Sequence, residues 1–197
     1  MQDIIKKSAA AALLIGLGDF ALLKLGEPLG PIIFAFGLLG VCYLGLNLFT
    51  GKCGFLFEDK LKLRDLLIIL AANLVFGYLI GLIFHVADPS IVPPAMDKVI
   101  GWEFTFDFFI RSLLCGVIMY LAVKMFKKGT PVGIIFGIPL FIFCGFQHCI
   151  ANVITMGVAM EFSWTLIRAV LGNFLGSILM SYLSTDLEIK RKRRVQR

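Results

Sequence analysis

Residues 145–152, Gly-Phe-Gln-His-Cys-Ile-Ala-Asn, interrupt an apolar run that extends over about residues 132–160. A helix needs only about 20 apolar residues to cross a bilayer, because each residue adds ~1.5 Å. This run is longer than that and holds an imidazole, His148, near its middle. An ionisable group at such depth usually faces a cavity or a partner, since an unpaired polar group in hydrocarbon costs several kcal/mol. The interruption therefore predicts a polar site near the middle of a membrane.

The chain as a whole is too apolar for a soluble core. Of its 197 residues, 59% are hydrophobic and 16% are charged, and the mean hydropathy is +0.92. These values indicate a multi-pass integral membrane protein. The net charge of +6 would suit a nucleic acid, but the basic residues gather at the ends of apolar segments. We therefore expect contact with membrane lipids and none with nucleic acid. The five cysteines form no CxxC pair, and we expect no metal and no cofactor.

Six apolar segments predict an all-α membrane protein that forms a single transmembrane channel domain, residues 1–197. The segments are residues 4–25, 31–57, 66–86, 104–126, 131–160 and 163–183. We expect the second and fifth helices to be broken, near Thr50 and His148. The basic residues that flank the segments fall on one side; they are Lys6, Lys7, Lys60, Lys62, Arg64, Lys127, Lys128 and residues 190–194. By the positive-inside bias, both termini are expected to be cytoplasmic in a bacterial-type inner membrane.

The chain resembles itself at an offset of 100 positions without gaps. Residues that match are Gly16 with Gly116, Pro31 with Pro131, Gly45 with Gly145, and Asn73 with Asn173. The two breaks match as well, with Asn47 on Gln147. Each unit crosses the membrane three times, which is an odd number. The second copy therefore enters the membrane from the opposite side. We therefore predict an inverted three-plus-three repeat, with halves at about 1–90 and 101–190, and a site at mid-membrane where half-helices present N–H groups to an anion.

Two motifs in the breaks resemble signatures of the formate/nitrite transporter family. Residues 48–52, LFTGK, are similar to LFTGN, and residues 145–152, GFQHCIAN, are similar to GFEHxxAN. The resemblance implies an aquaporin-like protomer, a homopentamer with a pore through each subunit, and a central His148 that faces Thr50. It also implies apolar constrictions and polar support around that pair. The constrictions are Phe34, Leu38, Leu48 and Phe141, and the polar support is Asn152 and Asn173.

Four residues depart from the family pattern. Gln147 stands where the family has the Glu before its His, and Asn47 stands where it has the Glu of GxELFTG. Lys52 replaces the Asn after LFTG, and Gly116 replaces the Asn of the fourth-helix Cys-Asn. The changes leave fewer acidic groups and add a cation near the expected pore. Gln147, Asn47 and Lys52 are therefore included among the candidate residues of the central site.

A narrow apolar pore selects solutes by whether they can lose their charge. The idealised cost of moving a carboxylate-sized anion into apolar surroundings is of order 20 kcal/mol, and protonation removes most of it. Small protonatable anions such as formate, nitrite or hydrosulfide should then pass better than chloride. We expect a channel or proton-coupled facilitator for such monovalent anions, in which the anion is protonated near His148 between the constrictions. Its partners would be the anion and protons.

Other interpretations remain open at this stage. An aquaporin-like channel for small neutral solutes would share the fold, although the paired Asn-Pro-Ala loops are missing. An intramembrane enzyme with His148 as base lacks a neighbouring Ser or acid, so we expect no enzyme. Asn73 and Asn173 are as suited to tying loop backbone together as to touching solute. Asp19 and Arg111 lie at similar depth in the first and fourth helices, which predicts an ion pair between them.

Overall fold

The computed structural model describes the backbone of residues 1–195 and the side chains of residues 1–184. The basic side chains of residues 190–194 lie outside the described side chains. Within the described part, every regular element is a helix. The elements are α1 (Gln2–Leu25), α2 (Leu29–Tyr43), α3 (Phe49–Lys52), η1 (Cys53–Phe55), α4 (Leu63–Ala87), η2 (Pro89–Ile91), α5 (Val92–Ile100), α6 (Phe106–Lys127), α7 (Val132–Phe143), α8 (Cys149–Ala159) and α9 (Thr165–Val195).

Four of these helices are long and apolar enough to cross a bilayer, namely α1, α4, α6 and the first 20 residues of α9. Three further apolar helices, α2, α7 and α8, are shorter. Large apolar side chains also cover the outside; Phe36, Phe136 and Tyr182 are 63%, 70% and 74% exposed. Contiguous apolar surface of this kind is rare on proteins that live in water. The outer surface is therefore suited to lipid or to other protein.

The helices α2 and α7 end in the same way, 100 residues apart. The residues Gly45 and Gly145 have φ of 61° and 67°, a left-handed conformation that only glycine adopts without strain. Beyond each glycine, a backbone N–H returns to a carbonyl five residues earlier: Leu46 to Val41 and Phe146 to Phe141, both at 2.9 Å. This Schellman arrangement satisfies the last carbonyls of each helix and turns the chain sharply. The turns explain why both apolar segments stop being helical well before Thr50 and His148.

The chain becomes helical again one residue after Leu48 and one residue after His148. Both residues have extended backbone, with ψ of 127° at Leu48 and 113° at His148. The restarted helices differ in length, since α3 has 4 residues and continues into η1, whereas α8 has 11. Each restart leaves backbone N–H groups without a helical partner. These groups are the local feature around which the site is built.

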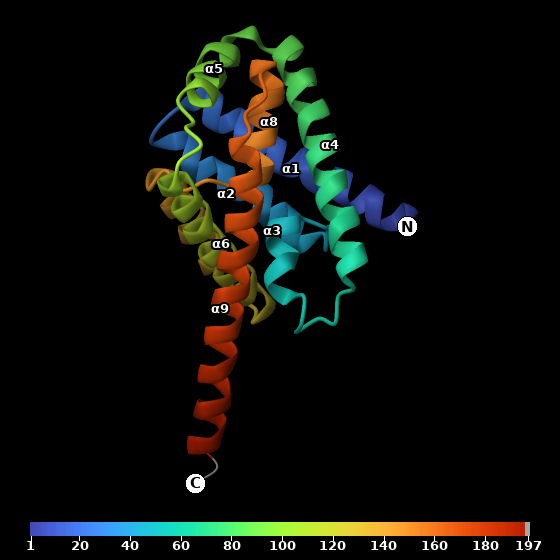
Figure 1. Ribbon diagram of the computed structural model, residues 1–197, viewed down its shortest axis with the longest axis vertical. Helices are drawn as coiled ribbons and strands as arrows, with labels where there is room; N and C mark the ends of the chain where they lie inside the picture. Colours follow the sequence, from blue (N-terminus) through green and yellow to red (C-terminus); the bar gives the residue numbers. More distant parts are fainter. Residues whose placement is uncertain (196–197) are drawn as a thin grey trace.

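The packing brings the two halves of the chain together. The helix α8 packs on α4 and α5, and η1 packs on α9, so each short helix contacts the other half. Figure 1 shows α8 beside α4, with α5 at one end of the molecule and the C-terminal part of α9 extending at the other. The helices α6 and α9 can approach closely because Gly116 has no side chain. A Cβ atom there would overlap the backbone of Asn173. This contact fixes Asn173 behind the start of α8.

Candidate functional site

Thr50 and His148 meet in the interior. The distance between Thr50 Oγ1 and His148 Nε2 is 2.8 Å, and the two residues are 1% and 3% exposed. His148 is also the N-cap of α8, because its Nδ1 accepts a hydrogen bond from the Ala151 N–H at 3.1 Å. An accepting nitrogen carries no proton, so the neutral ring has its proton on Nε2. The Nε2–H then donates to Thr50 Oγ1.

Two asparagine side chains form hydrogen bonds with the backbone at the starts of α3 and α8. Asn73 Oδ1 accepts from the Phe49 N–H at 2.8 Å, and its Nδ2 donates to the Asn47 carbonyl at 3.0 Å. One hundred residues later, Asn173 Oδ1 accepts from the Cys149 N–H and Nδ2 donates to the Gln147 carbonyl, both at 2.8 Å. Each amide thus joins the carbonyl just before the extended residue to the first N–H of the short helix, so it spans the extended residue.

A cavity of about 380 Å³ lies on the α3 side of the Thr50–His148 pair, and we call it the Lys52 cavity. Its charged lining residues are Lys52, Asp59 and Lys127. Lys127 Nζ lies 2.7 Å from both oxygens of Asp59. Among the described side chains, Lys52 has no recorded hydrogen bond or ion pair, so it is the uncompensated cation of this cavity.

A second cavity of about 320 Å³ lies on the α8 side, and we call it the His148 cavity. Its charged lining residues are Asp19, Glu27 and Lys98. The two cavities are related by the 100-residue offset. Positions 41, 42, 45, 46, 48, 51 and 52 line the first, and positions 141, 142, 145, 146, 148, 151 and 152 line the second. The same local backbone therefore forms both cavities.

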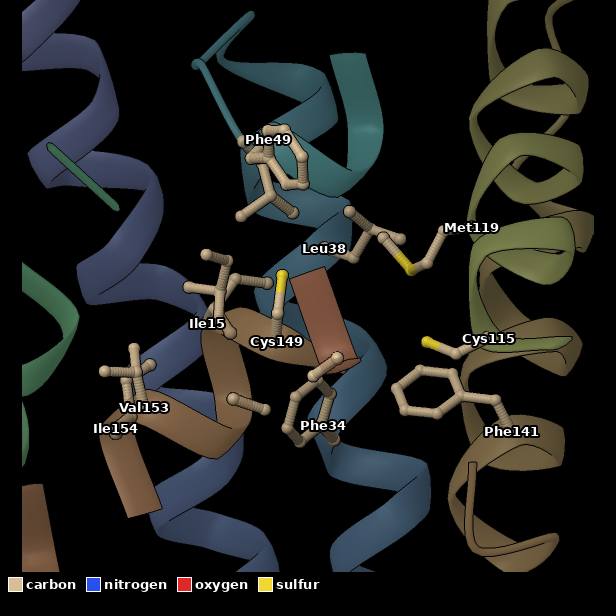
Figure 2. Close-up of a cluster of buried hydrophobic side chains, with 14 of the residues drawn as sticks. Ile15, Phe34, Leu38, Phe49, Cys115, Met119, Phe141, Cys149, Val153 and Ile154 are labelled. Carbon is tan, nitrogen blue, oxygen red and sulfur yellow. The ribbon is translucent and has the colours of Figure 1, made fainter. Parts of the chain in front are cut away.

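A layer of apolar side chains lies between the cavities. Leu38 and Leu48 line only the Lys52 cavity, whereas Phe34 and Phe141 line only the His148 cavity. All four are at most 3% exposed. The rings of Phe34 and Phe141 point toward one another (Figure 2), with centroids 6.1 Å apart and planes at 88°. Phe141 also stacks on the His148 ring at 6.0 Å, so the polar pair lies against the aromatic part of the layer.

The remaining candidate residues divide into two groups. Gln147 and Asn152 line the His148 cavity, and Gln147 Oε1 accepts from Asn152 Nδ2 at 3.1 Å. Asn47 and Asn173 line neither cavity. The side-chain amide of Asn173 bonds to backbone groups, which is the tying function considered above. Asn47 takes part through its backbone, since its carbonyl accepts from Asn73 Nδ2. Lys52 lines the first cavity, as described.

The expected ion pair between Asp19 and Arg111 is wrong. Arg111 Nε lies 2.9 Å from Asp107 Oδ2, one helical turn earlier. Asp19 instead accepts a hydrogen bond from Thr155 Oγ1 at 2.8 Å. The reason is that α1 packs against α2, α4 and α8, which turns Asp19 toward α8.

Sequence reasoning also missed the contribution of α5. This helix packs on α8 and brings Pro94 and Lys98 to the His148 cavity. Its buried residues Ala95 and Val99 continue a spacing of four residues from the buried Ile91 of η2, and this spacing is the signal that predicts a helix there.

Comparisons with known proteins agree with one another. Residues 2–185 match the profile of the family described as Formate/nitrite transporter. Two proteins of Bacillus subtilis (strain 168), described as uncharacterized transporters YwcJ and YrhG, are each 26% identical. The first alignment covers 78% of this chain and 72% of YwcJ, and the second covers 81% and 66% of YrhG. The formate channel FocA of Haemophilus influenzae is 26% identical over 66% of this chain and 53% of its own length.

Two solved structures share the fold. One is described as an FNT family ion channel, with a TM-score of 0.74 and 22% identity over 96% of this chain and 89% of the other. The second is described as a pentameric formate channel with formate bound, with a TM-score of 0.74 and 17% identity over 96% of both chains. At these identities the likeness establishes the all-helical channel fold for this chain.

Proposed function

Because this chain belongs to the formate/nitrite transporter family, we propose that it is a channel or proton-coupled facilitator for small monovalent weak-acid anions of the formate, nitrite or hydrosulfide class. It is an integral membrane protein. Similar proteins are named as transporters or as a formate channel. The observation that carries the proposal is the pair of matched cavities divided by an apolar layer that contains the Thr50–His148 contact.

The proposed topology is an inverted three-plus-three repeat that crosses the membrane six times, with broken second and fifth helices. Three features that recur at an offset of 100 residues support this topology. They are the two Schellman turns, the hydrogen bonds of Asn73 and Asn173 to the starts of the short helices, and the seven pairs of cavity-lining positions. Both termini then lie in the cytoplasm of a bacterial-type inner membrane. We further propose a homopentamer. The similar structure described as pentameric and the exposed apolar side chains both favour that assembly.

The apolar layer acts as the selective barrier in this proposal. Between Leu38, Leu48, Phe34 and Phe141 an anion would lose its water without gaining a counter-charge. The idealised penalty is of order 20 kcal/mol for a charged group and is largely removed when the group is neutral. A weak acid therefore crosses in its protonated form, whereas chloride has no such form available.

Thr50 and His148 provide the polar contact inside the barrier. Because Nε2–H of His148 donates to Thr50 Oγ1, the hydroxyl hydrogen of Thr50 is available to a passing solute. His148 takes up a second proton at Nδ1 only by releasing the Ala151 N–H. A proton lent by His148 to the anion would thus be coupled to a change in the first turn of α8.

Purified protein in liposomes tests the proposal. Formate, nitrite and hydrosulfide should enter much faster than chloride, and the flux should rise as the external pH falls. The variant His148→Ala should reduce formate flux roughly tenfold, the lower range of what a positioned proton-transfer group contributes. His85→Ala is the matched control, because His85 lines neither cavity and its Nδ1 contacts the Val158 carbonyl.

Three outcomes would count against the proposal. Chloride flux equal to formate flux would remove the protonation step. Water flux without formate flux would favour a channel for neutral solutes. An unchanged rate and pH profile in His148→Ala would remove His148 from the mechanism.

A further inference from the structure

A carboxyl group in the wall of the His148 cavity has no role in the proposed function. Asp19 of α1 is 1% exposed, and its Oδ2 accepts a hydrogen bond from Thr155 Oγ1 at 2.8 Å. Its other oxygen, Oδ1, has no recorded partner among the described side chains. Every fully enclosed polar side-chain atom in that part does have a partner. Oδ1 is therefore open to the cavity that Asp19 lines.

Asp19 stands between the mouth of this cavity and the apolar layer. Thr155 follows His148 by seven residues in α8, which is roughly 10 Å along the helix axis. The exposed Glu27 also lines the cavity. Phe34 and Phe141 line it as well, and Phe141 stacks on the His148 ring. Asp19 therefore lines the same cavity through which a solute would approach Phe34 and Phe141.

Thr155 determines which oxygen of Asp19 exchanges a proton. Its hydroxyl donates to Oδ2 and also lies 3.2 Å from the Ala151 carbonyl, which holds the hydroxyl in place. An oxygen that accepts such a bond is the poorer site for a proton. The proton of the neutral acid therefore sits on Oδ1, the atom that faces the cavity.

Few charges surround Asp19. Lys98 of α5 attracts it across the cavity but forms no ion pair with it. Glu27 lies in the exposed turn between α1 and α2, and Lys24 at the end of α1 is already paired with Asp88. The facing titratable groups on α4 and α8 are His85 and His148, each engaged with backbone. The carboxylate is therefore only partly compensated, and it can take up a proton from the outer solution or from a weak acid.

We propose that, for a weak acid entering through the His148 cavity, Asp19 and not His148 is the group that exchanges the proton, with Thr155 as its positioning residue. His148 then acts on the neutral acid through its contact with Thr50 Oγ1. The inference rests on the proposed function. In the inward direction the O–H bond on Oδ1 breaks and a bond to hydrogen forms on the anion. Asp19 is left as a carboxylate, and the neutral acid moves on between Phe34 and Phe141. The outer solution then returns a proton to Oδ1, so that one proton accompanies each anion.

The test measures formate flux into proteoliposomes as the external pH is varied. Asp19→Asn should lower the flux roughly tenfold, the lower range for loss of a positioned proton donor, and should flatten its dependence on external pH. Thr155→Val should shift the midpoint of the profile, and Thr155→Ser should restore it. Glu27→Gln is the matched control, since it removes a carboxylate from the exposed part of the same cavity. It should change the flux in a salt-dependent way without moving the midpoint.

Infrared difference spectra on substrate-free protein give an independent measurement. A pH jump should produce a carboxylic acid C=O band that is absent in Asp19→Asn and displaced in Thr155→Val. A wild-type protein that passes no weak acid would overturn the proposed function. Wild-type flux with an unchanged Asp19→Asn profile would overturn only the role of Asp19. Equal midpoint shifts in Glu27→Gln and Asp19→Asn, or a band that persists in Asp19→Asn, would also overturn that role.

Discussion

At the scale of single residues, the amide of Asn173 does more than any other group to hold the start of α8. It makes three hydrogen bonds of 2.7 to 2.8 Å. Its Oδ1 accepts from the Cys149 N–H, and its Nδ2 donates to the carbonyls of Gln147 and Ser112. Asn173 is fully buried. The carbonyl of Gln147 directly precedes His148, so the amide fixes the backbone on both sides of the imidazole.

Replacement of this amide should be costly. Asn173→Leu leaves the Cys149 N–H and the Gln147 carbonyl without partners, at about 1–3 kcal/mol for each buried group. The Ser112 carbonyl loses only an additional bond, because it lies in the interior of α6. We expect a loss of roughly 3 kcal/mol or more, seen as a lower unfolding temperature in detergent. Ser177→Ala, one turn later on α9, removes a single bond to the Gly116 carbonyl and should cost about 1 kcal/mol. Equal stability of the two variants would contradict this account.

Some residue contacts follow from the sequence and others do not. The contact of Thr50 with His148 was expected because the resemblance of their two motifs to the family signatures implies it. The partner of Asp19 was not, since depth in a membrane says nothing of the direction in which a side chain points. That direction depends on how α1 crosses α8, which arises from contacts far apart in the chain.

At the scale of elements, the ends of helices decide where the polar groups lie. The repeat predicted matching breaks, but it placed them near Thr50 and His148, whereas α2 and α7 end at Tyr43 and Phe143. The difference arises because Gly45 and Gly145 stop each helix and an extended residue must follow before the next one starts. Hydropathy marks the polar residues of each break but does not report the positive φ of Gly45 and Gly145, which sets where the helix ends.

The C-terminal end of α1 is joined to η2 by a pH-dependent contact. Lys24 Nζ donates to Asp88 Oδ2 at 2.7 Å, and Ser90 donates to Oδ1 from both its hydroxyl and its backbone. These bonds, chiefly that from Lys24, lower the pKa of Asp88 from 3.8 to about 2. Because the folded-state pKa is lowered, the stabilisation is fully present above about pH 4 and disappears as the pH falls toward 2.

This contact gives a prediction for acid unfolding. Asp88→Asn should unfold at a lower temperature than wild type at pH 6, and the difference should vanish near pH 2, measured by thermal scans in detergent. The control is Asp107→Asn. Asp107 pairs with Arg111 of the same helix, so this ion pair does not connect two elements. A difference for Asp88→Asn that persists unchanged at pH 2 would show that the ion pair is not its origin.

At the scale of the whole molecule, the two cavities share a backbone design but carry different charge. Lys127 and Asp59 offset one another, so Lys52 leaves the first cavity with a formal charge of +1. Asp19 and Glu27 outweigh Lys98 in the second, which gives a formal charge of −1 when both acids are ionised. The expected cytoplasmic side thus attracts anions, whereas the other side repels them until a proton is taken up.

Lys52 should therefore govern how readily anions reach the barrier from the Lys52 cavity. Because a charged cavity concentrates counter-ions, Lys52→Gln should lower formate efflux from proteoliposomes roughly threefold to tenfold at low ionic strength. The loss should shrink at ~1 M salt, where the Debye length is only about 3 Å. Lys52→Arg keeps the charge and should keep the flux, and Lys60→Gln removes an exposed cation that lines neither cavity. If Lys52→Gln loses flux equally at all salt concentrations with its oligomer intact on size exclusion, the lysine acts through packing and its charge does not steer the anion.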